Sequence, residues 1–120
     1  MGDDRDLDAN ELALLKRVLA AKSVDAVREL SWQVPYTTVR GGIPTLLDLA
    51  VDRAAPAAHV EDGPLPVRAM IVGPHEEPCG EVLVWISDGY LDGLEYAWFT
   101  DDVPAGMPSA DWVRLIDTSC

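Results

Sequence analysis

The segment at residues 73–80 contains the side chains of this chain that are best suited to chemistry. His75, Glu76 and Cys79 lie close together there, and imidazole, carboxylate and thiolate groups all bind zinc. A tetrahedral site needs a fourth ligand, and His59 is the one other histidine in the sequence. No two of these residues have the spacing of a known zinc motif. The segment therefore predicts either a weak metal site, with His75, Glu76 and Cys79 as its ligands, or a plain solvated loop.

The same segment raises the possibility of covalent catalysis. Cys79 could act as a nucleophile with His75 or His59 as its base, but nothing in the sequence places a base beside the thiol. The alternative is that Cys79 is a small buried apolar residue. The chain has no GxSxG elbow and no glycine-rich phosphate loop, so no cofactor is predicted. A small metal-dependent or hydrolytic enzyme built on the His75–Cys79 loop is the second hypothesis for function.

A stretch rich in aromatic residues, Gly80–Trp98, is predicted to form a β-hairpin. Asp88-Gly89 suits a two-residue type I′ turn, because both central residues of that turn have positive φ. A regular register then pairs Ile86 with Leu91, Val84 with Gly93 and Leu83 with Leu94. A rival turn at Asp92-Gly93 would shift the whole register. With the first turn, one face of the hairpin is small and aliphatic apart from Glu95. The other face carries Leu83, Trp85, Asp92, Leu94, Tyr96 and Trp98, with Tyr90 at its rim.

Two interpretations of the aromatic face stay open. Aromatic residues at strand spacing are commonly part of the core, but tyrosine and tryptophan also anchor protein interfaces. Acidic residues at 88, 92, 101 and 102 would surround such an interface and favour a basic partner. The predicted binding residues are Trp85, Tyr90, Asp92, Tyr96, Trp98, Asp101 and Asp102.

The charge of the chain limits the classes of partner. Its 120 residues carry a net charge of −12, which disfavours nucleic acids and anionic membranes as partners. The acidity either serves solubility alone or favours a cationic partner. The leading hypothesis is a non-enzymatic binding module that self-associates or neutralises a basic protein, as small acidic immunity-type proteins do. A ligand pocket between the sheet and the helices is a third possibility.

The order of the elements predicts one α+β domain over residues 1–120. Helices are expected at 7–21 and 24–32, where apolar residues recur at helical spacing, and strands at 36–40, 46–51, 65–72, 81–87 and 90–99. Helices that precede strands favour two helices packed on one face of a mainly antiparallel sheet of about five strands. Residues 1–6 are predicted to be a disordered tail. Residues 100–120 are predicted to be an extension that packs on the body, with one or two helical turns within 109–116.

The location of the protein is predicted from what its ends and cysteines lack. No apolar run approaches the roughly 18 residues of a membrane span, and the acidic N-terminus has no apolar core of a signal peptide. The two cysteines, Cys79 and Cys120, form no CxxC pair and are expected to be reduced thiols. A cytoplasmic protein is therefore expected.

Two motifs carry a resemblance to a known family. The segments VLVWISDGYLDGLEYAWFTDDVP and VPYTTVRGGIPTLLDLAVD resemble a family of small actinobacterial α+β proteins with no assigned activity, over about residues 10–115 of this chain. Relatives often carry cysteines near the turn at residues 41–45, and this chain has none there. The resemblance implies a fold and a source, and it implies no metal or redox role here.

Overall fold

The computed structural model describes residues 4–22 and 24–116, which form an α+β fold. The helices are α1 (Ala9–Val18) and α2 (Val27–Gln33), and two 3₁₀ turns are η1 (Val34–Tyr36) and η2 (Ala110–Trp112). The strands are β1 (Arg5–Asp6), β2 (Thr37–Ile43), β3 (Leu46–Val51), β4 (Gly63–Pro64), β5 (Arg68–Val72), β6 (Pro78–Ser87), β7 (Tyr90–Trp98) and β8 (Val113–Ile116).

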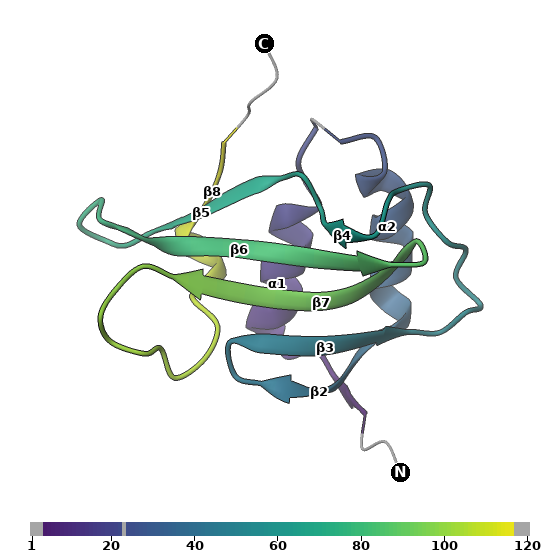
Figure 1. The fold of residues 1–120 in the computed structure, drawn as a ribbon, viewed down its shortest axis with the longest axis horizontal. Helices are drawn as coiled ribbons and strands as arrows, with labels where there is room; N and C mark the ends of the chain where they lie inside the picture. Colours follow the sequence, from purple (N-terminus) through teal and green to yellow (C-terminus); the bar gives the residue numbers. More distant parts are fainter. Residues whose placement is uncertain (1–3, 23, 117–120) are drawn as a thin grey trace.

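The strands form one antiparallel sheet in the order β1-β2-β3-β7-β6-β5-β8, with β4 beside β6 (Figure 1). The prediction of about five strands is wrong, because the sheet formed by the described residues has eight. The three additional strands are β1, β4 and β8, of two, two and four residues. Segments this short are too brief to show an alternating pattern, and pairing with distant strands creates them.

One of the two terminal predictions also needs correction. Arg5 and Asp6, predicted to lie in a disordered tail, pair with Val39 and Thr38 of β2. Residues 1–3 of that tail lie outside the described residues. Within 109–116, the predicted helical turns are limited to η2, and the chain then continues as β8 along β5.

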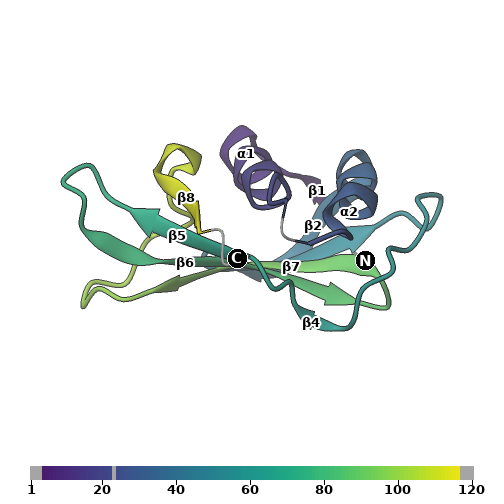
Figure 2. The same cartoon turned by 90° about the horizontal axis from the view of Figure 1, so that it is seen from above.

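The core lies between the helices and one side of the sheet. Figure 2 shows α1 and α2 on the same side of the sheet. Leu14 and Leu15 of α1 and Leu30 of α2 are completely buried. Ile71 of β5 and Leu94 of β7 are equally buried opposite them. In the sheet, residues that are directly paired share a side, so the register identifies the residues on the other side as well.

The start of α1 has an unusually well paired carboxylate. Glu11 and Asp8 form a reciprocal capping box, in which the Glu11 amide donates to Asp8 and the Asp8 amide donates to Glu11. The Arg5 guanidinium donates to both oxygens of Glu11, at 2.8 and 2.9 Å. Glu11 therefore joins β1 to α1, and the hydrogen bonds from Arg5 lower the pKa of its carboxyl group.

We expect Glu11→Gln to cost about 1–2 kcal/mol of unfolding free energy at neutral pH, because a charge-assisted pair is lost and an amide N–H faces Arg5. The pKa of Glu11 is lower in the folded than in the unfolded chain, where it is about 4.3. The contribution of Glu11 to the free energy of unfolding is therefore complete above about pH 4.3, and it disappears as the pH falls through the pKa that Glu11 has in the folded chain. Urea unfolding at several pH values measures this. The difference in unfolding free energy between wild type and Glu11→Gln should shrink in acid, and a difference that stays constant with pH would contradict this role of Glu11. Glu61→Gln, in an exposed loop, is the control.

The segment after β7 returns to α1 through one asparagine. The side-chain Nδ2 of Asn10 donates to the Pro108 carbonyl at 2.8 Å, and its Oδ1 accepts from the backbone amide of Ala110 at 2.9 Å. This pair of hydrogen bonds positions η2 against α1 and directs β8 to the edge of β5. Within the described residues, the helices are too short or too polar to cross a membrane.

Candidate protein-binding surface

The hairpin of β6 and β7 has the predicted turn. Asp88 and Gly89 have φ values of 54° and 82°, as a type I′ turn requires. The turn is held from outside as well, because the Gly89 carbonyl accepts from the Ala58 amide at 2.7 Å and from the Gln33 side chain at 2.8 Å. Ile86 pairs with Leu91 as predicted.

Beyond that pair the predicted register is wrong by one residue. A β-bulge inserts Asp92, so that Trp85 pairs with Gly93, Val84 with Leu94 and Leu83 with Glu95. A slip of one residue moves each following side chain of the strand to the opposite side. The rival Asp92-Gly93 turn is not formed; those two residues lie at the bulge instead.

The bulge divides the predicted aromatic face between two sides of the sheet. Tyr96 pairs with Val82 on the helix side and is 6% exposed. Burial raises the pKa of the Tyr96 hydroxyl. Trp98 pairs with Gly80 and packs against the core, whereas Trp85 lies on the opposite side. The prediction of a common face for Trp85, Tyr96 and Trp98 is therefore wrong, and so is the prediction that Glu95 lies on the aliphatic face.

The side of the sheet away from the helices carries a second set of large apolar side chains. We call this side the open sheet face. The register places Leu46, Glu95 and Leu83 in one row across three strands, and Asp48, Gly93 and Trp85 in the next row. Ile43 and Leu46 are 60% and 37% exposed. The open sheet face includes Ile43, Leu46, Asp48, Pro64, Arg68, Met70, Glu81, Leu83, Trp85, Gly93, Glu95, Ala97 and Arg114.

The indole of Trp85 is fixed across the neighbouring strand. Its Nε1–H donates to Glu95 at 2.9 Å. A methyl group added at Gly93 would lie 3.3 Å from Trp85 Cβ and 3.4 Å from Cδ1, so the ring occupies the space that a side chain at position 93 would fill. The lack of a side chain at Gly93 therefore lets the indole lie over β7, half-buried, with its Nε1 end at Glu95.

Each arginine near the open sheet face already has an acidic partner. Arg68 lies 3.5 Å from Glu81, and Arg40 lies 4.0 Å from Asp92, the only predicted acidic binding residue that contacts a base in the described structure. Within the described residues, Asp48 has no ion-pair partner, and Glu95 bonds to a neutral indole. The side chains around Trp85 therefore leave negative charge unbalanced.

The remaining predicted binding residues lie apart from Trp85 or at its margin. Tyr90 packs against the core, donates to the Ala55 carbonyl at 3.1 Å and has the Arg53 guanidinium 3.7 Å from its ring centre. Asp101 and Asp102 are exposed in the segment that follows β7. The structure thus keeps Trp85 and Asp92 near one another and does not gather the other five with them.

The loop at residues 75–79 does not form a metal-ligand set among the described residues. Glu76 makes two hydrogen bonds to Arg114 of β8, at 2.7 and 2.8 Å, and this pairing lowers the pKa of its carboxyl group. The thiol of Cys79 points to the Glu77 carbonyl at 3.5 Å. His59 lies elsewhere, 2.8 Å from Glu29. Across 4–22 and 24–116, no three His, Cys, Asp or Glu side chains are grouped to hold a metal ion.

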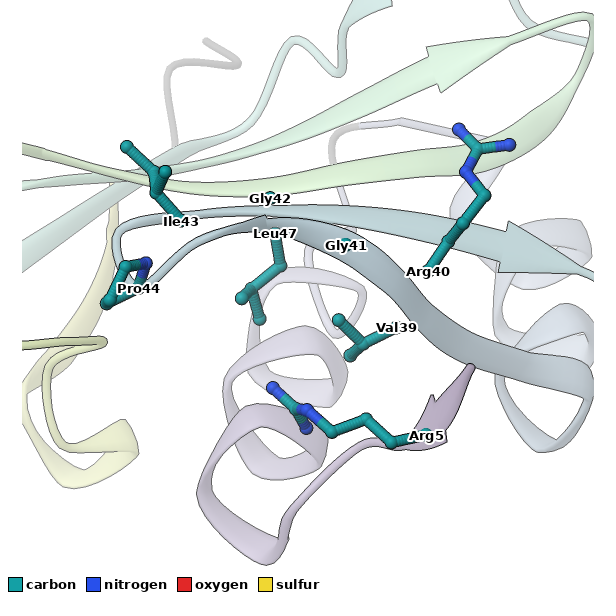
Figure 3. A pocket seen from close by; sticks show the side chains of 8 residues that line it. All are labelled: Arg5, Val39, Arg40, Gly41, Gly42, Ile43, Pro44 and Leu47. Carbon is teal, nitrogen blue, oxygen red and sulfur yellow. The ribbon is translucent and has the colours of Figure 1, made fainter. Parts of the chain in front are cut away.

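A hollow of about 320 Å³ lies beside the end of β2 and is lined by Arg5 and Arg40 among others. Figure 3 shows the two arginine side chains pointing in different directions, Arg5 toward α1 and Arg40 toward the strands of the sheet. Each of them is paired with a carboxylate, Glu11 or Asp92. The two guanidinium groups therefore do not converge on an anion.

Sequence reasoning missed most of the open sheet face, although one signal was present. In the sequence of β7, Leu91 and Leu94 are three positions apart instead of two, with Asp92-Gly93 between them. Such an interruption, at an Asp-Gly pair, is what a β-bulge produces. Applying it would have placed Glu95 beside Trp85. Comparison of the chain with family models, with curated proteins and with solved structures finds no match, so the function has to be inferred from this geometry.

Proposed function

We propose that this protein is a non-enzymatic binding module that docks a basic protein partner on its open sheet face. The observation that carries this proposal is the apolar character of that face. An antiparallel sheet covered on one side by helices commonly carries polar side chains on the other. Here the second side carries Ile43, Leu46, Met70, Leu83 and Trp85. Ile43 and Leu46 are exposed, and Met70, Leu83 and Trp85 are partly buried. Neighbouring apolar residues that stay accessible within a charged margin are typical of protein interfaces.

The charge of the molecule supports a basic partner over a second copy of the chain. Two copies with a net charge of −12 each would repel one another, whereas a basic protein would be attracted at long range. Near the face, Arg40 and Arg68 are paired with acids, and Asp48 and Glu95 form no ion pair with a base in the part of the chain that the structure describes. The local charge therefore has the same sign as the global charge, and both favour a cationic partner.

We expect Leu46→Lys to weaken partner binding at least about tenfold, which corresponds to about 1.4 kcal/mol. The new ammonium group would repel a basic partner but would lie opposite Glu95, a favourable cross-strand pair, so the fold should be retained. Trp32→Lys is the matched control. Trp32 is 61% exposed and lies on α2, and its replacement makes the same change in charge on the helix side of the molecule.

The measurement has two stages. Proteins captured from the source organism by immobilised wild type and Trp32→Lys, but not by Leu46→Lys, are identified and purified. Their dissociation constants for the three chains are then measured calorimetrically at low and high salt. A positively charged partner whose binding weakens with salt and with Leu46→Lys supports the proposal. A partner that binds all three chains equally, an acidic partner, or no protein that distinguishes the variants would refute it. Self-association, detected by sedimentation and abolished by Leu46→Lys, would replace the basic partner with a second copy.

A further inference from the structure

The open sheet face has one place where an aromatic ring, two carboxylates and a glycine come together. Trp85 lies over Gly93, its Nε1–H is bonded to Glu95, and Asp48 is paired with Gly93 on the far side. The indole, on β6, therefore has Glu95 beside it on the adjacent strand β7, and Asp48 one strand further away, on β3. We call these four residues the Trp85 cluster.

The Trp85 cluster has the chemistry that recognises a guanidinium group. A flat, delocalised cation stacks on an indole face, and carboxylates at the ring margin accept its N–H groups in pairs. An ammonium group is a compact charge that stacks less well and gains less from two flanking carboxylates.

The charges around the indole ring of Trp85 are mainly negative, as binding of a guanidinium group requires. Asp48, Asp92 and Glu95 contribute three negative charges, and Arg40, 4.0 Å from Asp92, contributes one positive charge. The Glu95 oxygen that bonds to the indole keeps the ring in place, and its carboxylate still carries a full charge because the indole is neutral. The ring is thus held in position and the local charge is not balanced.

We propose that the open sheet face binds an arginine side chain of the partner, with its guanidinium stacked on Trp85 and bonded to Asp48 and Glu95. This inference rests on the proposed function, and it names the chemical group at the centre of the contact. Stacking and ion pairing are both needed, since an exposed ion pair alone contributes little. Leu46 and Leu83, which flank Glu95 in the same row, would cover the methylene groups of the arginine.

The test uses the peptide acetyl-Gly-Arg-Gly-amide and two matched peptides with citrulline or lysine in place of arginine. Citrulline keeps the shape of arginine and lacks its charge. The reporter is the ¹H–¹⁵N signal of the Trp85 indole, assigned from its loss in Trp85→Phe. We expect the arginine peptide to shift this signal with a dissociation constant of roughly 1–10 mM, the lysine peptide to bind at least about threefold more weakly, and citrulline to cause no saturable shift.

Glu95→Gln is the decisive variant, because an amide oxygen can still accept from the indole while the charge is lost. We expect it to weaken binding of the arginine peptide at least about fivefold, and Glu61→Gln, which removes an exposed acid elsewhere by the same chemical change, to leave that binding unchanged. Equal shifts by citrulline and arginine, equal weakening by both variants, or an unmoved Trp85 signal would overturn the inference. If the arginine peptide does not bind while Leu46→Lys still weakens binding of a basic partner, the proposed function stands and the arginine contact is refuted. If the arginine peptide binds but no protein partner loses affinity for Leu46→Lys, the proposed function is refuted and the arginine site stands.

Discussion

Replacing Gln33 with leucine is expected to lower the free energy of unfolding by about 2–4 kcal/mol. Gln33 is the last residue of α2 and is completely buried. Its Nε2 donates to the Pro56 carbonyl at 3.0 Å and to the Gly89 carbonyl at 2.8 Å, and its Oε1 accepts from the Leu91 amide at 3.0 Å. Leucine fills a similar volume but leaves the buried Leu91 amide without a partner, which costs the full desolvation of that group.

Urea unfolding of Gln33→Leu and Gln33→Glu checks this expectation. Glutamate has the shape of glutamine but would place a carboxylate against two carbonyl oxygens, so we expect Gln33→Glu to be the less stable variant at neutral pH and to recover part of the loss in acid. Ser31→Ala is the control, since the Ser31 hydroxyl bonds to its own helix in an exposed position, and it should change stability by less than about 0.5 kcal/mol. A Gln33→Leu chain as stable as the wild type would show that the buried amide finds another partner.

Gln33 also explains how the open sheet face is positioned. It joins α2, the segment after β3 and the hairpin turn through three hydrogen bonds, so the helix layer and the turn cannot shift independently. The turn sets the register of β6 against β7, and the register sets which residues surround Trp85. We therefore expect loosening at Gln33 to broaden or shift the Trp85 indole signal even under conditions in which the chain stays folded.

The features that were predictable from sequence are those with local causes. The capping box at Asp8 and Glu11 and the turn at Asp88-Gly89 depend on residues within a few positions, and the structure contains both. The helical spacing of apolar residues around Leu15 and the alternation of Val82, Val84 and Ile86 along their strand are likewise local patterns. These four residues are buried, as the patterns predict.

The features that were not predictable depend on pairing between distant segments. Arg5 and Asp6 show no pattern of their own, and they form a strand because β2 lies beside them. Trp112, Leu115 and Ile116 have spacing that also fits a helix, yet residues 113–116 pair with β5, more than forty positions away. Pairing of this kind is decided by tertiary contacts and overrides local preference.

The candidate site shows how large the effect of one residue can be. Trp85 lies on the side of the hairpin opposite Val82, Val84 and Ile86, as predicted, but the bulge at Asp92 exchanged its neighbours. Tyr96 and Trp98 lie on the helix side, and Glu95 and Ala97 replace them. The exchange turns an aromatic patch into a single indole with a carboxylate partner.

Gly89→Ala is expected to lower the free energy of unfolding by about 2–3 kcal/mol, through two effects at one residue. Gly89 has a φ of 82°, a conformation that L-residues adopt at a cost. A Cβ atom there would lie 2.5 Å from the Ala58 carbonyl oxygen and 3.1 Å from the Ala58 amide nitrogen. The backbone cannot move aside cheaply, because the Ala58 amide is bonded to the Gly89 carbonyl at 2.7 Å.

Thermal and urea unfolding measure the loss, with Gly106→Ala as the matched control. A Cβ at Gly106 would meet no atom of residues 4–22 or 24–116 within 4 Å, so the control should stay within about 0.5 kcal/mol of the wild type. Because Gln33 also donates to the Gly89 carbonyl, the two substitutions share a partner, and Gln33→Leu combined with Gly89→Ala should cost less than the sum of the single losses. Strict additivity, or a Gly89→Ala chain as stable as the Gly106→Ala control, would mean that the turn is held by β6 and β7 alone and that α2 does not set the register of the open sheet face.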